Sequence, residues 1–354
     1  MFEKSVTMVE EGLGKYFPSA ALAIGVRNKI FVKKTWGETS IYGDGEKINF
    51  DTLYDMASLS KVVGTTMVAL KFIEDGKLCI DDTVGSFFKA PDDKKDITIL
   101  RLMTHTSGLP ASFLLSECTN SPAGVPDAIL NHALAVPVGS QTIYSCMGFI
   151  LLAKILEKIG NAPLDELAQK YVFDPLNMKS TTYHPQGSAA CTEFDKESGK
   201  CLCGVVHDEN SRFQKGVSGN AGLFSSLNDM IKYATMLACD GVFDGRIYLS
   251  HAMLAAAVHN YTEGCSEHRG LGFALSSDNC FLGTTFSRKA FGHTGFTGTS
   301  IAVDPESGLY VVLLTNRVHP SRDNNTIVRF RRLFHNCIGA EYSRYMQETK
   351  YLNY

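Results

Sequence analysis

The chain has 354 residues, of which 44% are hydrophobic and 20% are charged, a composition that suits a globular protein with a large core and excludes collagen-like, coiled-coil and disordered chains. With 34 Lys and Arg against 37 Asp and Glu the formal net charge is −3, so no basic excess favours nucleic acid or an anionic membrane. No apolar run could span a membrane, and the first residues do not form a secretion-signal pattern. We therefore expect a cytoplasmic protein without nucleic-acid or membrane partners, whose oligomeric state the sequence leaves open.

Strand-like runs occur near both ends of the chain. Residues Ala20–Trp36 predict two short strands that meet at a turn containing Asn28. After a mostly helical section, about 58–240, strand-like runs return at 270–276, 290–292, 300–303 and 309–315. Strands at both ends around a helical middle predict an α/β protein with one sheet built from both termini and an inserted helical region.

The C-terminal part predicts an amphipathic helix. Its apolar residues are spaced by three or four positions: Ile327, Phe330, Phe334 and Ile338. A basic group on the same segment is interpreted as its solvated face: Arg329, Arg331 and Arg332. We expect a single domain over residues 1–354, with a sheet subdomain from about 1–50 and 241–354 and a helical subdomain from about 51–240.

The ten cysteines are spread along the chain without the spacing of a disulfide framework, and we expect them to be reduced. One local group could offer metal ligands: Cys191, Cys201, Cys203 and His207. Only one residue separates Cys201 from Cys203, unlike the C-x2-C spacing of zinc sites. Loop cysteines are therefore favoured over a metal site here, although a metal site stays open as the alternative. We expect no catalytic metal and no cofactor.

A serine and a lysine lie three residues apart at the start of a predicted helix. The segment from Asp55 to Lys61 opens this helix, and Gly76 ends it. Ser58 and Lys61 would rise on one helix face. A serine hydroxyl is a poor nucleophile until a neighbouring base takes its proton, and a desolvated lysine can assist. The pattern is weak alone, because a second S-x-x-K, Ser86 to Lys89, lies in what we interpret as a solvated loop.

Four further segments accompany Ser58. Thr104-His105-Thr106-Ser107-Gly108 follows at a short distance, and Tyr144-Ser145-Cys146 runs into a helix that Gly160 ends. Gly219-Asn220-Ala221-Gly222 comes later, and His293-Thr294-Gly295-Phe296 stands near the C-terminus, directly after a strand-like run. Together with Ser58 and Lys61, these motifs resemble the S-x-x-K serine hydrolases of the β-lactamase and penicillin-binding-protein superfamily, on its class C-like branch. The resemblance runs from about Ala20 to Pro320.

The resemblance implies a fold and a set of roles. The fold would be a mainly antiparallel sheet packed by terminal helices against the helical region, with the site in the cleft between them. Ser58 matches the nucleophile, Lys61 its partner and Tyr144 the tyrosine that shares the proton transfer. A phenol is a base at neutral pH only beside cations such as Lys61. Cys146 stands where the family usually has asparagine, and a thiol cannot replace the donors and carbonyl of an amide.

The same resemblance assigns the strand near the C-terminus to substrate binding. His293, Thr294 and Gly295 match the K-T-G triplet, with histidine in place of the lysine that helps to hold a substrate carboxylate. A partly charged histidine would attract a carboxylate more weakly and with a pH dependence. Phe296 matches the residue whose backbone N–H forms the oxyanion hole with that of Ser58. Histidine at this position indicates a shift away from efficient β-lactamase activity.

The function implied is hydrolysis of a small ester or amide through an acyl-serine, as in carboxylesterases and D-amino-acid peptidases. A class C-like β-lactamase is the first alternative. A non-catalytic module that binds peptidoglycan fragments is an alternative of another class. Cys146 keeps this alternative open, because it replaces the asparagine that the family usually has.

Three other features have plainer interpretations. We expect His105 to be structural, with its ring hydrogen-bonded to the backbone. We expect the polar segment Val206–Asn210 to be a loop that lines the cleft. Gly219 and Gly222 are interpreted as tight turns and not as a phosphate site, because no G-K-[ST] follows them.

Overall fold

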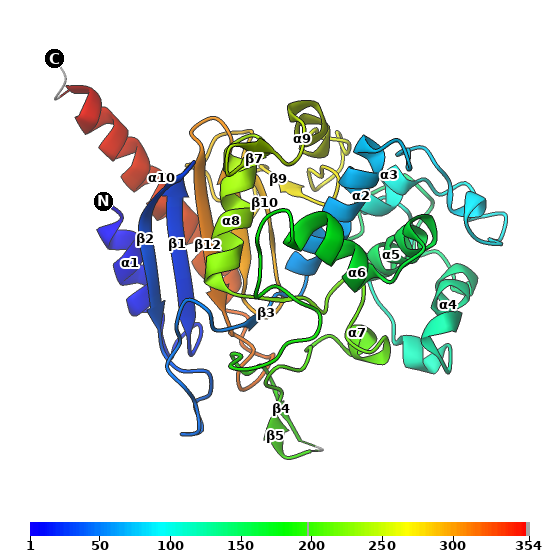
Figure 1. The fold of residues 1–354 in the computed structure, drawn as a ribbon, viewed down its shortest axis with the longest axis horizontal. Coiled ribbons are helices and arrows are strands. Elements are labelled where there is room, and N and C mark those ends of the chain that lie inside the picture. Colours follow the sequence, from blue (N-terminus) through cyan, green and yellow to red (C-terminus); the bar gives the residue numbers. More distant parts are fainter. Residues whose placement is uncertain (197, 352–354) are drawn as a thin grey trace.

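The computed structural model of the chain describes residues 1–196 and 198–351. Its main sheet is antiparallel, with six strands in the order β2-β1-β12-β11-β10-β9. These strands are β1 (Ala20–Val26), β2 (Lys29–Trp36), β9 (Ala274–Leu275), β10 (Phe291–Thr294), β11 (Ser300–Asp304) and β12 (Leu309–Thr315). Because β1 pairs with β12, the sheet joins the two ends of the chain, as the sequence predicted. The mixed fold with an antiparallel sheet is confirmed (Figure 1).

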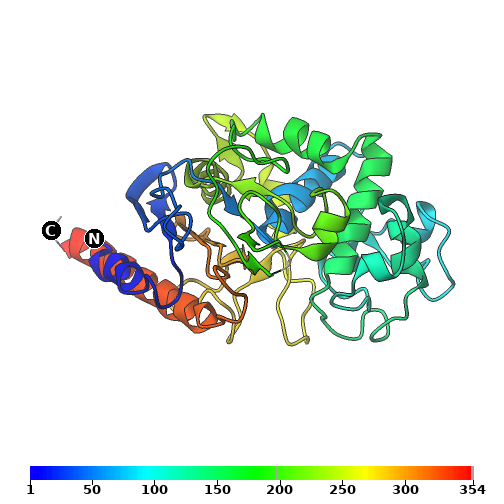
Figure 2. The ribbon, with the colours of Figure 1, turned by 90° about the horizontal axis from the view of Figure 1, so that it is seen from below.

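The central strands are covered on both faces. Every residue of β12 is buried, which explains its unbroken apolar sequence. Helices α1 (Glu3–Glu10) and α10 (Ile327–Tyr351) pack together on one side of the sheet, and Figure 2 shows the two helices side by side with both termini near them. On the other side α8 (Leu227–Ala238) packs against β1 and β12. The sheet is therefore the middle layer of the molecule.

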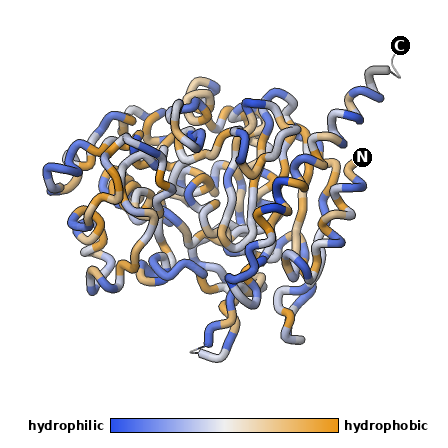
Figure 3. Tube along the Cα trace, turned by 180° about the vertical axis from the view of Figure 1, so that it is seen from behind, coloured by the Kyte–Doolittle hydropathy of each residue, from blue (hydrophilic) through white to orange (hydrophobic). Residues whose placement is uncertain are grey.

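The predicted tail helix is confirmed, with one correction. Its four apolar residues, Ile327, Phe330, Phe334 and Ile338, are buried against the sheet. Hydrophilic and hydrophobic residues alternate along this helix in Figure 3. The interpretation of its arginines as a solvated face is wrong for Arg331, which is only 5% exposed. Arg331 lies four residues after Ile327 and three before Phe334, so it shares their buried face.

The remaining helices form the part of the molecule beside the sheet. The α-helices are α2 (Thr66–Glu74), α3 (Ile99–Met103), α4 (Val125–Asn131), α5 (Cys146–Gly160), α6 (Leu164–Ala168), α7 (Glu209–Phe213) and α9 (His251–Ala257). Shorter helical turns cover Lys61–Thr65, Val84–Ser86, Leu115–Glu117, Pro122–Gly124 and Gln169–Phe173. Short strand pairs are β3 (Tyr54–Asp55) with β6 (Phe224–Ser225), β4 (Phe194–Asp195) with β5 (Lys200–Cys201), and β7 (Val242–Phe243) with β8 (Arg246–Ile247).

One large apolar cluster joins the sheet to this helical part, since it includes residues such as Ala21 and Val312 together with Leu151. The division into subdomains near residues 50 and 240 stays a prediction. Helix α8 falls within the range predicted for the helical part, yet it packs on the sheet.

None of the helices in residues 1–196 and 198–351 is both long enough and apolar enough to cross a membrane.

Two sequence expectations about local structure are wrong. The strand expected over 270–276 is reduced to β9, because a turn around Gly272, at φ 82°, precedes it. The cysteines are not all reduced, because Cys191 and Cys203 form a disulfide at the base of the β4–β5 hairpin. The pairing arises from the reversal of the chain in the hairpin, which sequence spacing alone did not reveal.

The possible ligand group around these cysteines is not gathered into a metal site. The sulfur atoms of Cys191 and Cys203 are bonded to each other. The Nε2 atom of His207 is engaged with Glu193, whose Oε2 lies 3.1 Å away. Within the described ranges, no three His, Cys, Asp or Glu side chains are placed to hold a metal ion.

Candidate active site

Ser58 lies in a tight turn between β3 and the helix that follows. The predicted helix begins only after Ser58, because Tyr54 and Asp55 belong to a strand. Asp55 is buried, and its carboxylate accepts hydrogen bonds from Ala57 N at 2.8 Å and His207 N at 2.7 Å. Burial raises the pKa of Asp55 to about 6, against the lowering effect of these two bonds. Ala57 takes the left-handed conformation at φ 45°, so the turn that presents Ser58 is held by Asp55.

Lys61 is fully buried, and its ammonium group points at Ser58. Its Nζ donates to Ser58 Oγ at 3.0 Å and to the carbonyl oxygen of Asn220 at 3.0 Å, and lies 3.6 Å from Cys146 Sγ. Burial alone would lower the pKa of Lys61, but its acidic neighbours Cys146 and Tyr144 outweigh burial, so the net shift of this pKa is upward. Lys61 is therefore a cation at neutral pH, with its protons directed at these partners.

Tyr144 lies beside Lys61, just before α5. Ser145 caps that helix by accepting from Gly148 N, and its own N–H donates to His105 Nδ1 at 3.0 Å. The predicted structural role of His105 is confirmed by this backbone bond. The Tyr144 ring lies 4.9 Å from Lys61 Nζ and 5.4 Å from the guanidinium carbon of Arg269. Its hydroxyl is buried and meets no hydrogen-bond geometry within the described ranges, but it lies close enough to Lys61 to help raise the pKa of that lysine. Two cations therefore lie beside this phenol.

The end of β10 is attached to the turn that holds Ser58. Thr297 Oγ1 donates to Asp55 O at 2.7 Å, and Thr299 Oγ1 donates to Met56 O at 3.1 Å. Between them, the backbone of Gly295 packs directly on Met56 and Ala57. In the part of the chain that the structure describes, the N–H groups of Ser58 and Phe296 make no hydrogen bond. Two free backbone donors at such a junction are what an oxyanion hole requires.

His293 is a neutral residue in this structure. Burial, reinforced by the charges of Arg269 and Lys61, lowers the pKa of His293 well below its usual range. Its Nδ1 donates to Thr294 O at 2.9 Å, so Nε2 carries a lone pair and no proton. Nε2 is buried and, among the described residues, has no partner. The pH-dependent positive charge expected at this position is therefore absent near neutral pH.

A cleft of about 1080 Å³ contains these groups. Seven of the eight predicted site residues line it, whereas Lys61 lies below its surface: the seven are Ser58, Tyr144, Cys146, His293, Thr294, Gly295 and Phe296. The segment Val206–Asn210 reaches the cleft as predicted, through His207, Asp208 and Glu209, but it is a loop only as far as Asp208, because Glu209 and Asn210 begin α7. The second S-x-x-K motif lies elsewhere, with Ser86 and Lys89 exposed.

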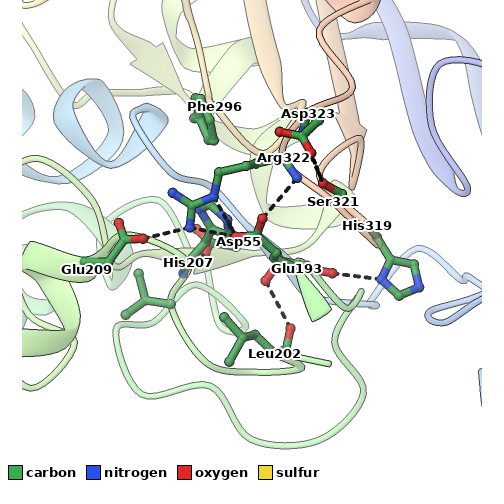
Figure 4. A network of polar contacts seen from close by, with 12 residues as sticks. Asp55, Glu193, Leu202, His207, Glu209, Phe296, His319, Ser321, Arg322 and Asp323 are labelled. Atoms are coloured by element: carbon green, nitrogen blue, oxygen red, sulfur yellow. Dashed lines mark hydrogen bonds and ion pairs between the residues drawn. The ribbon is translucent and has the colours of Figure 1, made fainter. Parts of the chain in front are cut away.

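Ion pairs hold one wall of the cleft. Figure 4 shows Arg322 between Glu193 and Glu209, with Phe296 nearby. Burial disfavours ionisation of Glu193, but hydrogen bonds from Arg322 prevail and lower the pKa of Glu193 to about 2. The Phe296 ring, 48% exposed, lies 5.6 Å from the His207 ring and 4.3 Å from the guanidinium carbon of Arg317. This wall is thus an aromatic and charged surface.

Sequence reasoning missed three contributions to the site. The segment around Asn220 was among the motifs of the resemblance, but no side-chain pattern reveals that its carbonyl oxygen accepts from Lys61. Arg331 donates to Gly295 O at 3.0 Å and Thr299 O at 2.9 Å, and its helical spacing could have shown it to be buried. Arg269 reaches the cleft from the turn before β9, and the sequence around it offered no signal.

Comparison with known proteins agrees with this geometry. The beta-lactamase family model matches residues 7–335, so the chain belongs to the beta-lactamase family. An N-acetylmuramyl-L-alanine amidase of Bacillus subtilis is 28% identical over 359 residues, which cover 88% of this chain and 80% of the relative. A putative D-alanyl-D-alanine carboxypeptidase of Escherichia coli K12 is 30% identical over 349 residues, with 86% and 79% covered.

Solved structures share the fold at low identity. A penicillin-binding-protein homologue from Caulobacter crescentus has a TM-score of 0.76 at 17% identity, with 96% of this chain and 97% of that chain covered. A class C beta-lactamase from Rhodobacter sphaeroides has a TM-score of 0.75 at 18% identity, with 96% and 99% covered. Fold and family together make this chain a serine hydrolase.

Proposed function

We propose that Ser58 is the nucleophile of this hydrolase and that it forms an acyl-serine with a small ester or amide. The observation that carries the proposal is the 3.0 Å contact between Lys61 Nζ and Ser58 Oγ in the 1080 Å³ cleft. Because Lys61 is a cation that donates to Oγ, the proton of the Ser58 hydroxyl is free to pass to another group. Tyr144 is the acceptor that we assign, with Lys61 and Arg269 stabilising its anion.

The reaction then proceeds in two steps, acylation of Ser58 and hydrolysis of the acyl-serine. Ser58 Oγ bonds to the substrate carbonyl carbon while its proton moves to the phenolate oxygen of ionised Tyr144, and the backbone N–H groups of Ser58 and Phe296 bind the oxyanion. The bond to the leaving group breaks, and Tyr144 returns the proton to it. Water then attacks the acyl-serine with Tyr144 as the base again, which releases the acid and restores Ser58.

The substrate class is proposed from the relatives and the cleft. The two curated relatives are named for cleavage of muramyl-L-alanine amides and of D-alanyl-D-alanine peptides, so a peptide from cell-wall turnover that contains a D-amino acid is our first choice of amide. A neutral His293 supports slow β-lactam hydrolysis beside ester cleavage. The class C-like β-lactamase remains the alternative within the same chemistry.

A panel of substrates tests the proposal. Short-chain p-nitrophenyl esters, a chromogenic cephalosporin and D-Ala-D-Ala peptides are assayed in parallel, each with Ser58→Ala as the control. We expect ester cleavage that Ser58→Ala abolishes, and a mass increase of the native protein at Ser58 with a slowly released acyl probe. A Ser58→Ala variant as fast as the parent refutes the mechanism. Acylation of Ser58 without turnover favours the binding module, for which Cys146 in place of an amide leaves room.

The cytoplasmic location stays a prediction, and one observation weighs against it. Disulfides persist mainly in oxidising compartments, and Cys191 and Cys203 form one.

A further inference from the structure

The arginines of the cleft differ in how their donors are used. Arg331 donates to the carbonyl oxygens of Gly295 and Thr299. Arg317 donates to Phe296 O at 2.7 Å and to the loop at 322–325. Arg322 is paired with two carboxylates, those of Glu193 and Glu209. These three guanidinium groups hold the walls of the cleft together.

Arg269 is bound along only one edge. Its side chain is 10% exposed, and its Nε and Nη2 both contact Glu267 Oε2, at 3.1 Å for Nε. Its Nη1 donates to no residue in the part of the chain that the structure describes. The guanidinium carbon lies 5.4 Å from the centre of the Tyr144 ring, and the residue lines the cleft. An unused, charged donor therefore stands beside the group that we assign as the proton acceptor.

The backbone fixes Arg269 in this place. Its N–H donates to Thr262 Oγ1 at 2.9 Å, and its carbonyl oxygen accepts from Tyr261 N at 3.0 Å. It also forms an isolated β-bridge with Ala274, just before β9 pairs with β10. Arg269 is thus held by the same sheet edge that carries His293.

His293 is unsuited to bind a carboxylate here. The donor on its Nδ1 is used by Thr294 O, and the remaining Nε2 presents a lone pair. A lone pair and a carboxylate oxygen are both acceptors, so they repel each other. A carboxylate that enters the cleft near Tyr144 finds its donor on the arginine and not on the histidine.

We propose that Arg269, through Nη1, is the residue that binds a substrate carboxylate in this cleft, in place of His293. The inference rests on the proposed function and adds a specificity-determining residue to it. Arginine suits this task because its planar guanidinium keeps its charge and donates in fixed directions to carboxylates. The partner Glu267, whose side chain is 50% exposed, orients the guanidinium and offsets part of its charge.

The charge of Arg269 predicts how selectivity depends on pH. The titratable and charged groups around it are Glu267 and, across the cleft, Tyr144, Lys61, His105 and His293. Burial lowers the pKa of both histidines well below their usual range, so neither changes charge near neutral pH. Preference for a carboxylate over a neutral substrate should therefore stay constant from about pH 6 to about pH 8.5.

Matched substrate pairs test the proposal in the full-length protein. The first pair is p-nitrophenyl hemisuccinate and p-nitrophenyl butyrate, and the second is an acyl-D-Ala-D-lactate depsipeptide and its methyl ester. The ratio of kcat/KM within each pair is measured for the parent, Arg269→Gln, Arg269→Lys and Glu267→Gln. Arg288→Gln, whose side chain is 79% exposed, removes the same charge from an exposed site and serves as the control.

We expect Arg269→Gln to lower the ratio about tenfold to a hundredfold in at least one pair, the size of one charge-assisted hydrogen bond. Arg269→Lys should retain part of the preference and Glu267→Gln should raise it, while Arg288→Gln leaves it unchanged. Unchanged ratios in both pairs for Arg269→Gln and Glu267→Gln overturn the proposal, as does a preference that falls steeply between pH 6 and 8. If the neutral substrates are not cleaved by the parent, the proposed function itself has failed.

Discussion

Gly295 lies so close to Met56 that a Cβ atom on it would stand 2.6 Å from Met56 O and 2.1 Å from Thr299 Oγ1. Such separations are shorter than any real Cβ contact, so only glycine lets the end of β10 approach the turn before Ser58. This approach brings the turn that contains Phe296 onto the turn that contains Ser58, a contact that the proposed oxyanion hole needs.

Gly295→Ala should therefore separate the two backbone donors. Because loss of one oxyanion donor costs about 10²–10³ in rate, we expect kcat for a p-nitrophenyl ester to fall by about that factor. Gly148→Ala is the matched control, because a Cβ there would meet only ordinary contacts at 3.6 Å or more. Steady-state kinetics of both variants, with circular dichroism to show folding, check this. A Gly295→Ala variant within about threefold of the parent contradicts the assignment of Phe296 N.

Tyr144→Phe should lower the catalytic rate strongly and the free energy of unfolding only slightly. Its hydroxyl donates to no acceptor among the described residues, so its removal should cost less stability than the loss of a satisfied buried hydroxyl, about 1 kcal/mol. Removal of the proton acceptor should lower kcat by about 10²–10⁴-fold. Tyr233→Phe should behave in the opposite way, because its buried hydroxyl donates to Val62 O at 2.7 Å. That variant should lose about 1 kcal/mol of stability and keep its activity. Urea unfolding and ester kinetics distinguish these outcomes.

Sequence patterns predicted the elements whose burial is continuous or periodic. The apolar run Leu309–Thr315 became β12 with the same bounds, and the spacing of Ile327, Phe330, Phe334 and Ile338 predicted α10. Burial of a whole strand or of one helix face leaves this signal because it acts on many neighbouring residues at once. The motifs around Ser58, Tyr144 and His293 were found for a different reason, namely their resemblance to a known family.

The contributions that were missed depend on single contacts between distant parts of the chain. Arg269 contacts the Tyr144 ring, and Asn220 accepts from Lys61 through a backbone atom. Neither contact is encoded in local composition. The neutral state of His293 likewise depends on burial and on the charges of Arg269 and Lys61, which meet only when the cleft is assembled.

Glu193 should stabilise the protein in a pH-dependent way. Its pKa is lowered to about 2 in the folded chain, so its contribution to stability is complete above its unfolded pKa and is lost as the pH falls toward 2. We expect Glu193→Gln to cost about 1–2 kcal/mol at neutral pH, less than the full pKa shift because the site is partly exposed. The difference from the parent should shrink as the pH falls below about 4.5.

Urea unfolding of the parent and Glu193→Gln at several pH values checks this prediction. Glu306→Gln is the control, because its carboxylate pairs with Lys289 at 3.3 Å on an exposed surface and should contribute less than about 0.5 kcal/mol. An equal loss of stability for Glu193→Gln at neutral and acid pH would show that packing, and not ionisation, accounts for its effect.

The Cys191–Cys203 disulfide should stabilise the wall of the cleft that Glu193 belongs to. The bond joins residues separated by 12 positions, and closure of a loop of that size stabilises a fold by about 3 kcal/mol in the chain-entropy description. Replacement of both cysteines by serine should therefore lower the free energy of unfolding by up to about that amount. Cys201→Ser, which changes a free cysteine of the same hairpin, should have little effect.

The same experiment separates stability from catalysis. Glu193 lies two residues after Cys191 and contacts Arg322 and His207, while His207 N donates to the Asp55 carboxylate that holds the Ser58 turn. Loss of the disulfide should therefore reduce ester hydrolysis as well as thermal stability, and a thiol reductant should reproduce both effects in the parent but not in the double serine variant. If the reductant changes neither property of the parent, the bond does not contribute to the wall of the cleft.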